Sequence, residues 1–246
     1  MKPIYIDFET YSSEDIKSGG AYRYTQSPDF EILLIGYAIE DGDVNIIDMT
    51  QPGSIIKFAA FVRLILSPQY TIVAHNAQFE RLCLKAYKVD IPADRFMCTA
   101  TMALYAGFPE SLGNLSKALD LKEGKKGTGV ALIKFFCQPQ KPTRANPEEY
   151  RNLPKDYPEK WEEFIDYLRY DILSEREALA RLDYCNFPQS EIDLYRLDQD
   201  INDNGIAVDM ELAERADALN EEFCETLKNR IKTKYGISSL KSTMQL

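Results

Sequence analysis

The stretch that most constrains the fold is the apolar run Ile32-Leu33-Leu34-Ile35-Gly36-Tyr37-Ala38-Ile39. A run of this kind, without polar alternation, is typical of a strand that is covered on both faces. Such a strand needs neighbours in a sheet and helices above and below it, so we expect a layered α/β architecture. With 45% apolar residues in 246, the chain can bury one sizeable core and carry a small second unit.

Weaker patterns elsewhere in the sequence predict further strands, helices and a loop. Strands are expected at 4–9, 31–39, 44–48 and 70–74, with Asp41-Gly42-Asp43 as a turn between the second and third. Helices are expected at 55–66, 78–86, 159–182, 190–202 and 212–235, and a short one runs from its cap Ser111 to Leu119. Gly124, Gly127 and Gly129 predict a flexible loop. The order of elements indicates a mixed sheet layered with helices.

The charge distribution gives two opposite indications. The net charge of −10 argues against a nucleic-acid partner. Residues 122–144, however, hold six basic side chains against one acidic side chain, whereas 145–177 hold ten acidic against five basic. A basic loop either contacts phosphate or is a solvated surface, and both interpretations stay open here.

Several features bear on the compartment. No apolar run approaches the length that a membrane span needs. The first expected strand begins too close to Met1 to leave room for a signal peptide. The five cysteines are scattered and contain no Cys-x-x-Cys pair, which argues against zinc and against a disulfide framework. We therefore expect a cytoplasmic protein without a membrane partner.

Two carboxylates, Asp7 and Glu9, stand at the end of the first expected strand. Alternate residues of a strand point to opposite faces, so both acids lie on one face while Ile4, Ile6 and Phe8 lie on the other. Like charges at the edge of a buried sheet are costly unless a cation joins them. A hard ion such as Mg²⁺, which prefers carboxylate oxygens, is the natural partner.

Two later segments add further candidates. Glu80 opens the expected helix at 78–86, where a carboxylate is stabilised by the helix dipole. Tyr167 and Asp171 are four residues apart on a late helix and therefore share a face. Taken singly, each has an ordinary structural explanation, as a first-turn acid or as a helical Tyr/Asp pair.

The order of these features resembles the three motifs of the 3′–5′ exonucleases with a ribonuclease H-like fold, which are named for four acids plus a tyrosine. Several other stretches are similar to the proofreading region of phage and prophage family A DNA polymerases. These stretches are Tyr22-Arg23-Tyr24, 28–34, 74–81, and Asn152-Leu153-Pro154 ahead of Trp161-Glu162. Residues 201–209 resemble the segment that leads from this region into the polymerase part.

The resemblance implies a ribonuclease H-like mixed five-stranded sheet with helices on both faces, plus a C-terminal helical extension. Residues 1–187 would form a 3′–5′ exonuclease domain, and 188–246 would be a helical segment that begins a truncated polymerase region. The polymerase domain would then lie in cis or on a separate chain.

The resemblance also implies a two-metal hydrolysis of the 3′-terminal phosphodiester of DNA, with two Mg²⁺ or Mn²⁺ ions. Asp7 would bridge the ions, Glu9 and Asp171 would complete one site, and Glu80 would hold the other ion. Tyr167 would orient the attacking water.

Thr10 and Asn76 match positions that contact the terminal nucleotide in this family, so the partner would be a single-stranded 3′ end. Glu80 departs from the pattern, because the second motif normally supplies an aspartate. His75 is the single histidine and lies in the second motif, away from Asp171, which favours the tyrosine branch. We expect His75 to be a packed strand-end residue.

Three alternatives remain open. An RNA-trimming 3′–5′ exonuclease shares these motifs. A weakly active or inactive nucleic-acid-binding module of a polymerase would retain the fold with a site altered at Glu80. In the third alternative the acids are only a solvated surface.

Overall fold

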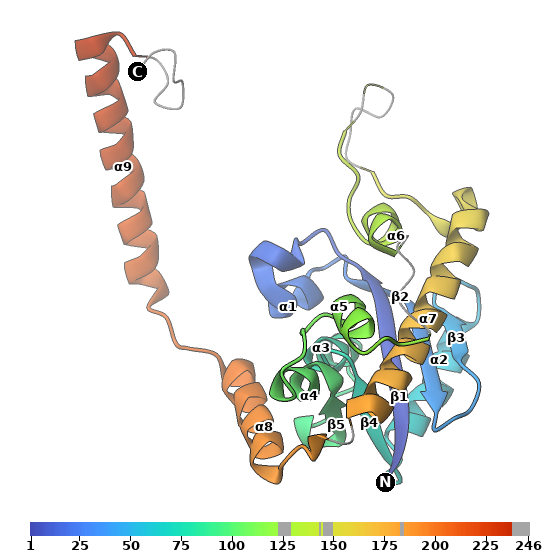
Figure 1. Cartoon of the computed structure of the whole chain (residues 1–246). Helices are drawn as coiled ribbons and strands as arrows, with labels where there is room; N and C mark the ends of the chain where they lie inside the picture. Colours follow the sequence, from blue (N-terminus) through green and yellow to red (C-terminus); the bar gives the residue numbers. More distant parts are fainter. Residues whose placement is uncertain (123–128, 143, 145–149, 183–184, 238–246) are drawn as a thin grey trace. The chain divides into compact units, whose positions relative to one another are not determined.

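The computed structural model describes residues 1–122, 129–142, 144, 150–182 and 185–237. It contains two compact units, Met1–Asp200 and Ile201–Leu246. The sheet and every site residue predicted from the sequence lie in the first unit (Figure 1).

Five strands form one mixed sheet in the order β3-β2-β1-β4-β5. The strands are β1 (Lys2–Tyr11), β2 (Glu31–Ile39), β3 (Asn45–Asp48), β4 (Tyr70–Ala74) and β5 (Phe96–Cys98). The central strand β1 pairs antiparallel with β2 and parallel with β4. The apolar run is β2, which lies between β1 and β3. The mixed five-stranded α/β sheet expected from the resemblance is therefore confirmed.

Helices connect the strands and follow them. They are α1 (Ile16–Gln26), α2 (Ser54–Ile65), α3 (Gln78–Ala86), α4 (Thr99–Tyr105), α5 (Leu112–Ala118), α6 (Gly129–Phe136), α7 (Pro158–Leu182), α8 (Gln189–Asn204) and α9 (Met210–Tyr235), with short 3₁₀ turns at Ala93–Arg95 and Pro154–Asp156. The predicted helices are all present, with small differences at their ends. The sequence did not predict α1, α4, α6 or β5.

The loop predicted around three glycines is wrong at Gly129, which is the first residue of α6. The helix buries Leu132 and Phe136 against Phe164 of α7, so tertiary packing overrides the poor helix propensity of glycine. Gly124 and Gly127 lie outside the described residues.

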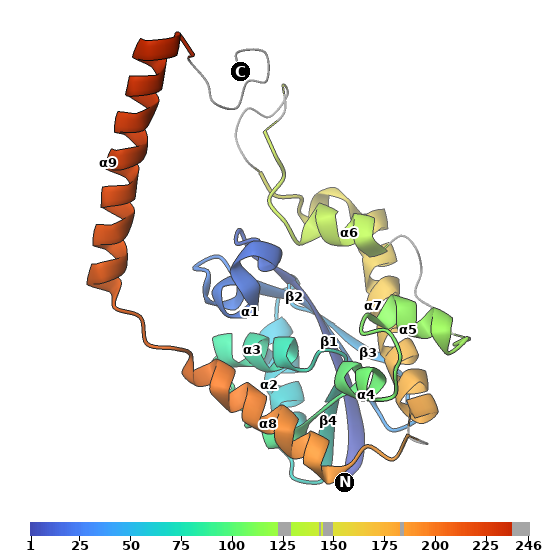
Figure 2. The same ribbon diagram turned by 60° about the vertical axis from the view of Figure 1, so that its left-hand side comes forward.

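Helices cover both faces of the sheet, as expected (Figure 2). On one face, Ile4, Ile6 and Phe8 of β1 pack with α2, and the rings of Phe8 and Phe61 meet edge to face at 6.1 Å. On the other face, Tyr5 belongs to a cluster with Ile172 of α7. The predicted alternation along β1 is thus confirmed, and it places Asp7 and Glu9 on the α7 face.

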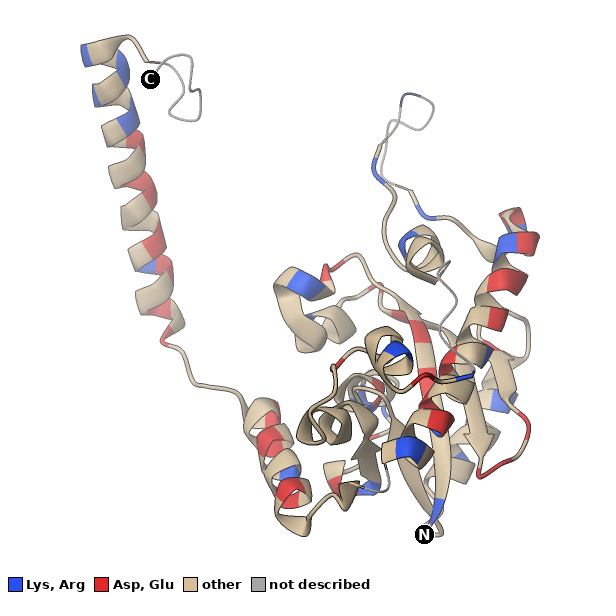
Figure 3. Ribbon diagram, viewed as in Figure 1, with Lys and Arg blue, Asp and Glu red and all other residues tan. Residues whose placement is uncertain are grey.

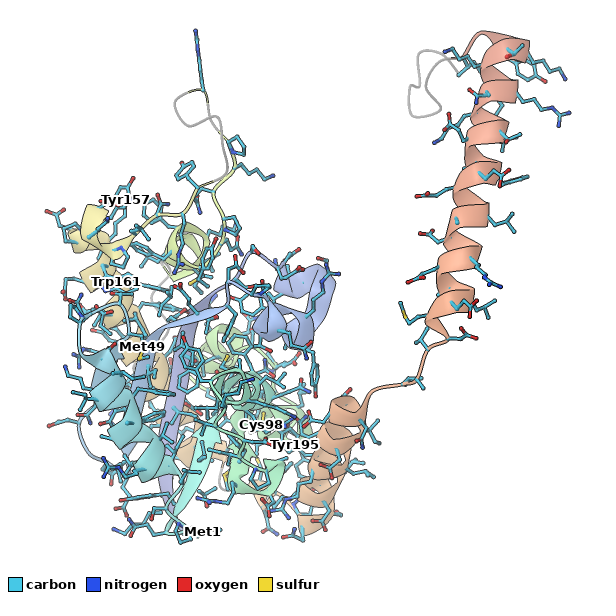
Figure 4. All side chains as sticks on the ribbon, turned by 180° about the vertical axis from the view of Figure 1, so that it is seen from behind. Met1, Met49, Cys98, Tyr157, Trp161 and Tyr195 are labelled. Carbon is cyan, nitrogen blue, oxygen red and sulfur yellow. The ribbon has the colours of Figure 1, made fainter. Side chains whose placement is uncertain are left out.

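A glycine in β2 allows α7 to lie close to the sheet. Gly36 pairs directly with Asp7, and a β-carbon added at Gly36 would lie 3.0 Å from side-chain atoms of both Leu168 and Ile172. Farther toward its N-terminus, α7 is attached to β3, because Trp161 Nε1 donates to Asp48 Oδ2 at 2.8 Å (Figure 4). These contacts fix α7 across β1 and β2.

The second unit contains the end of α8 and the whole of α9. Asp209 caps α9 by accepting from Leu212 N at 3.0 Å, and Gly236 ends it with a φ of 69°. None of the α9 side chains is buried. The predicted helical extension is present, and the functional boundary between residues 187 and 188 stays a prediction. No helix in the described part of the chain combines the length and the apolar character needed to cross a bilayer.

Candidate active site

Three carboxylates from two elements meet on the α7 face of the sheet. One ligand oxygen from each of Asp7, Glu9 and Asp171 lies within 4.8 Å of the others. The two β1 residues share a face because they are two positions apart. Asp171 joins them because α7 packs on β1, and Figure 3 shows the acidic segments of these two elements together. Such a set of oxygens can share a hard divalent cation.

Glu80 approaches this group from another element. It lies in the first turn of α3, as predicted, and is 2% exposed. Burial, and next the charge of Asp7, raise the pKa of Glu80 well above its usual range. Among the described residues, Glu80 Oε2 has no hydrogen-bond partner. The carboxylate therefore adjoins Asp7 without belonging to the compact group of three.

Tyr167 lies one turn before Asp171 on α7 and is fully buried. Burial, and next the charge of Asp171, raise the pKa of the phenol above its ordinary value of 10. The phenol therefore keeps its proton at neutral pH. Its ring lies against the backbone of Gly129, where an added β-carbon would overlap the ring atoms. The first residue of α6 thus fixes the position of the Tyr167 ring.

A cleft of about 710 Å³ opens over these residues. Every site residue predicted from the sequence lines it: Asp7, Glu9, Thr10, Asn76, Glu80, Tyr167 and Asp171. Lys17, Lys134 and Lys141 line the same cleft, and the last two come from the basic stretch. The cleft therefore combines an acidic floor with lysines.

The two predicted nucleotide contacts, Thr10 and Asn76, differ in their local setting. The Thr10 hydroxyl shares a 2.9 Å hydrogen bond with the Tyr24 hydroxyl. Asn76 adopts a φ of 70°, in the left-handed region that asparagine tolerates better than most residues.

His75 is held through both ring nitrogens. Nε2 donates to the carbonyl of Glu110 at 2.7 Å, and Nδ1 lies 2.9 Å from the Thr99 hydroxyl. Because a carbonyl can only accept, neutral His75 carries its proton on Nε2 and accepts from Thr99. This geometry agrees with the packed role expected for His75.

One buried acid and one thiol near the site were not singled out from the sequence. Glu175 lies one turn after Asp171 on α7 and is 1% exposed. Burial, and next the charges of Asp7 and Glu80, raise the pKa of Glu175. The four-residue spacing after Asp171 is the signal that could have identified it. The Cys137 thiol lies 4.0 Å from Glu9 Oε2 and donates to it.

Comparisons with known proteins give one close sequence relative. The chain is 40% identical over 247 aligned residues to a DNA polymerase of Bacillus phage SP02. The alignment covers all of this chain and 38% of the length of that polymerase. No family model matches the chain.

Two solved structures resemble the chain. The POL domain of Pol1 from M. smegmatis, in complex with DNA primer-template and dNTP, aligns with a TM-score of 0.52 at 14% identity, over 99% of this chain and 35% of that one. A structure described as the apo form of a nuclease aligns with a TM-score of 0.47 at 13% identity, over 80% of this chain and 79% of that one. At such identity, the first likeness is evidence of a shared fold only.

Proposed function

We propose that this chain is a 3′–5′ exonuclease that hydrolyses the 3′-terminal phosphodiester of DNA with two Mg²⁺ or Mn²⁺ ions. The observation that carries the proposal is the meeting of Asp7, Glu9 and Asp171, with ligand oxygens within 4.8 Å of one another. Tyr167 lies one helical turn from Asp171, and the cleft above them is open to a strand end.

Each acid has a role in this proposal. Asp7, Glu9 and Asp171 would hold one ion, and Asp7 with Glu80 would hold the second. Divalent ions, when bound, would supply a water of lowered pKa and stabilise charge on the leaving 3′ oxygen. The Tyr167 phenol, which keeps its proton, orients the attacking water by hydrogen bonding.

Substrate contacts come from the walls of the cleft. Thr10 and Asn76 would contact the terminal nucleotide, and Lys17, Lys134 and Lys141, which line the cleft, would meet phosphates of the single strand. The acidic floor repels DNA until cations are bound, so binding depends on divalent metal. The net charge of −10 is compatible with this mode of binding because the lysines gather at the cleft.

The similarity to a phage DNA polymerase supports a role in proofreading during DNA replication. The chain corresponds to 38% of the length of that relative. We infer that its partner is a polymerase region, in cis or on a separate chain, in the cytoplasm of a bacterial host.

Exchange of Asp7 for alanine tests the assignment. Asp7→Ala should abolish the Mg²⁺-dependent shortening of a single-stranded DNA oligonucleotide, and EDTA should abolish it for the unaltered chain. Asp166→Asn is a control, because Asp166 is an exposed acid of α7. An Asp7→Ala variant with near-normal activity would falsify the proposal.

Digestion of RNA alongside DNA separates an RNA-trimming enzyme from a DNA enzyme.

Glu80 favours a second candidate, a weakly active nucleic-acid-binding module. Its carboxylate stands outside the compact group of three and comes from a residue one methylene longer than the aspartate usual in the resembling family. In this candidate, Glu80→Asp restores metal-dependent cleavage that the unaltered chain lacks. If Glu80 already binds the ion well, the shorter aspartate side chain moves the carboxylate away from it. The Mn²⁺ concentration needed for half-maximal cleavage should then rise by about tenfold.

A further inference from the structure

His75 is anchored where three segments of the chain meet. It directly follows β4, and it lines the cleft. Its Nε2 donates at 2.7 Å to the carbonyl of Glu110, two residues before α5. Its Nδ1 accepts at 2.9 Å from the hydroxyl of Thr99, the first residue of α4. The imidazole therefore fixes the end of β4 against two elements that come later in the sequence.

The next residue, Asn76, has a backbone conformation that few side chains adopt. Its φ is 70°, in the left-handed region. A residue stays in such a conformation only where the contacts on both sides of it are firm. On the C-terminal side, the Asn76 carbonyl accepts from Phe79 N at 2.9 Å, in the turn that begins α3. On the N-terminal side, the anchored ring of His75 supplies the contact.

Thr99 lies outside the cleft, although its hydroxyl holds a residue of the cleft. The side chain is fully buried, and the described residues that line the cleft include His75 and Asn76 but not Thr99. An effect of the Thr99 hydroxyl on a bound strand therefore passes through His75. If Thr99 served only to fill space, a valine of nearly the same shape would replace it.

We propose that His75 is a positioning residue for the substrate, which is held by Thr99 and the Glu110 carbonyl and keeps Asn76 in the left-handed conformation that presents its side chain to the terminal nucleotide. This inference rests on the proposed function and deepens it. The carboxylates of Asp7, Glu9 and Asp171 lie on β1 and α7. Loss of the positioning contact should therefore weaken DNA binding and leave the compact group of three acids intact.

Fluorescence anisotropy with a labelled single-stranded DNA oligonucleotide tests this inference without requiring cleavage. The oligonucleotide carries non-hydrolysable linkages at its 3′ end, and Mn²⁺ is present. In Thr99→Val the Kd for DNA should rise by about three- to tenfold, which corresponds to one lost hydrogen bond. Thr99→Ser, which keeps the hydroxyl, should bind within about twofold of the unaltered chain. A packing role predicts the opposite order, because serine loses a methyl group that valine keeps.

Thr101→Val is a matched control. It makes the same exchange in the same helix, and Thr101 is likewise not among the described residues that line the cleft. Its Kd for DNA should equal that of the unaltered chain. With a cleavable oligonucleotide, Thr99→Val should raise KM by the same factor as Kd and leave kcat nearly unchanged, because a binding contact is lost and the chemical step is not.

A double-mutant cycle tests whether the effect passes through Asn76. Glycine adopts a positive φ without strain, so Asn76→Gly keeps the backbone and removes the side chain that would contact the nucleotide. Asn76→Gly should weaken DNA binding, and adding Thr99→Val to it should cause no further loss. Additive losses would show that the Thr99 hydroxyl acts by another route, and they would overturn the inference.

The outcomes separate this inference from the proposed function. If the unaltered chain cleaves DNA and Thr99→Val binds it with unchanged Kd, the inference about His75 is wrong while the proposed function stands. If the unaltered chain neither binds nor shortens DNA with Mn²⁺, both are wrong. Should Thr99→Val fail to fold, Thr99→Ala removes the same hydroxyl, and the same rise in Kd is expected of it.

Discussion

Tyr167 illustrates how burial selects between two possible roles for one side chain. A phenol with a lowered pKa could act as a base, but burial and the nearby Asp171 raise the pKa of Tyr167 above 10. The proton therefore remains on the oxygen through the whole neutral range. In the proposed reaction, a protonated phenol can serve by hydrogen bonding to the attacking water.

The exchange Tyr167→Phe tests this role. We expect kcat to fall by about 100-fold with little change in KM, because the water is no longer oriented. Because the folded-state pKa of the phenol is raised, the unaltered chain should lose no activity to phenol ionisation as the pH rises to about 10. Rates measured from pH 6 to 10 check both expectations. A fall in kcat near pH 9 that Tyr167→Phe lacks would contradict the protonated role.

At the scale of elements, the contact between α6 and α7 determines where Tyr167 can lie. Gly129 begins α6 with its backbone against the Tyr167 ring, and a β-carbon there would overlap the ring. Gly129→Ala should therefore displace the ring or the helix end and reduce kcat by about tenfold or more, since small misplacements of catalytic groups have large effects. Single-turnover rates on a DNA oligonucleotide measure the loss.

Val130→Ala serves as the control for that experiment, because Val130 is the next residue of α6 and is 62% exposed. Circular dichroism establishes that both variants keep their helices. Equal rates for Gly129→Ala and Val130→Ala would show that α6 does not position the tyrosine.

Strong periodicity made some elements predictable from the sequence. The alternation in β1 placed Asp7 and Glu9 on one face, and the four-residue spacing on α7 placed Tyr167 beside Asp171. Both depend only on the local geometry of one element. The meeting of β1 with α7 was expected through the family resemblance, because spacing within one element says nothing about its neighbours.

Other parts depend on tertiary contacts that local sequence does not encode. The strand β5 is only Phe96–Cys98 and is too short for a period to be recognised. Gly20 interrupts α1 with a φ of 73°. Glu175 is one of several acids in the sequence of α7, and only the packing of α7 on the sheet reveals that this one is buried.

For the molecule as a whole, the first compact unit extends past residue 187 to Asp200. The early part of α8 contacts this unit, because Arg81 Nη2 donates to Gln199 Oε1 at 3.1 Å and Arg196 Nη2 donates to the carbonyl of Asp94 at 3.3 Å. Tyr195 lies beside Cys98 of β5 (Figure 4). The first part of α8 is thus structurally part of the unit that carries the site.

Truncation at two positions tests this view. Removal of 201–246 should leave the melting temperature of the first unit nearly unchanged. Removal of 188–246 should lower it by about 2–8 °C, because the α8 contacts with Arg81 and Cys98 are lost. Differential scanning calorimetry of the two shortened chains measures the difference. Equal melting temperatures would show that α8 adds nothing to the first unit.

Hydrolysis from the 3′ end is the central claim for the whole molecule, and end-labelled DNA tests it most directly. A single-stranded oligonucleotide carrying different labels at its two ends is incubated with the chain and Mg²⁺, Mn²⁺ or EDTA. With either metal, the 3′ label should be released first as a mononucleotide, while the 5′ label remains on a ladder of shortening products. Release of the 5′ label first, internal cleavage, or equal release in EDTA would contradict the account.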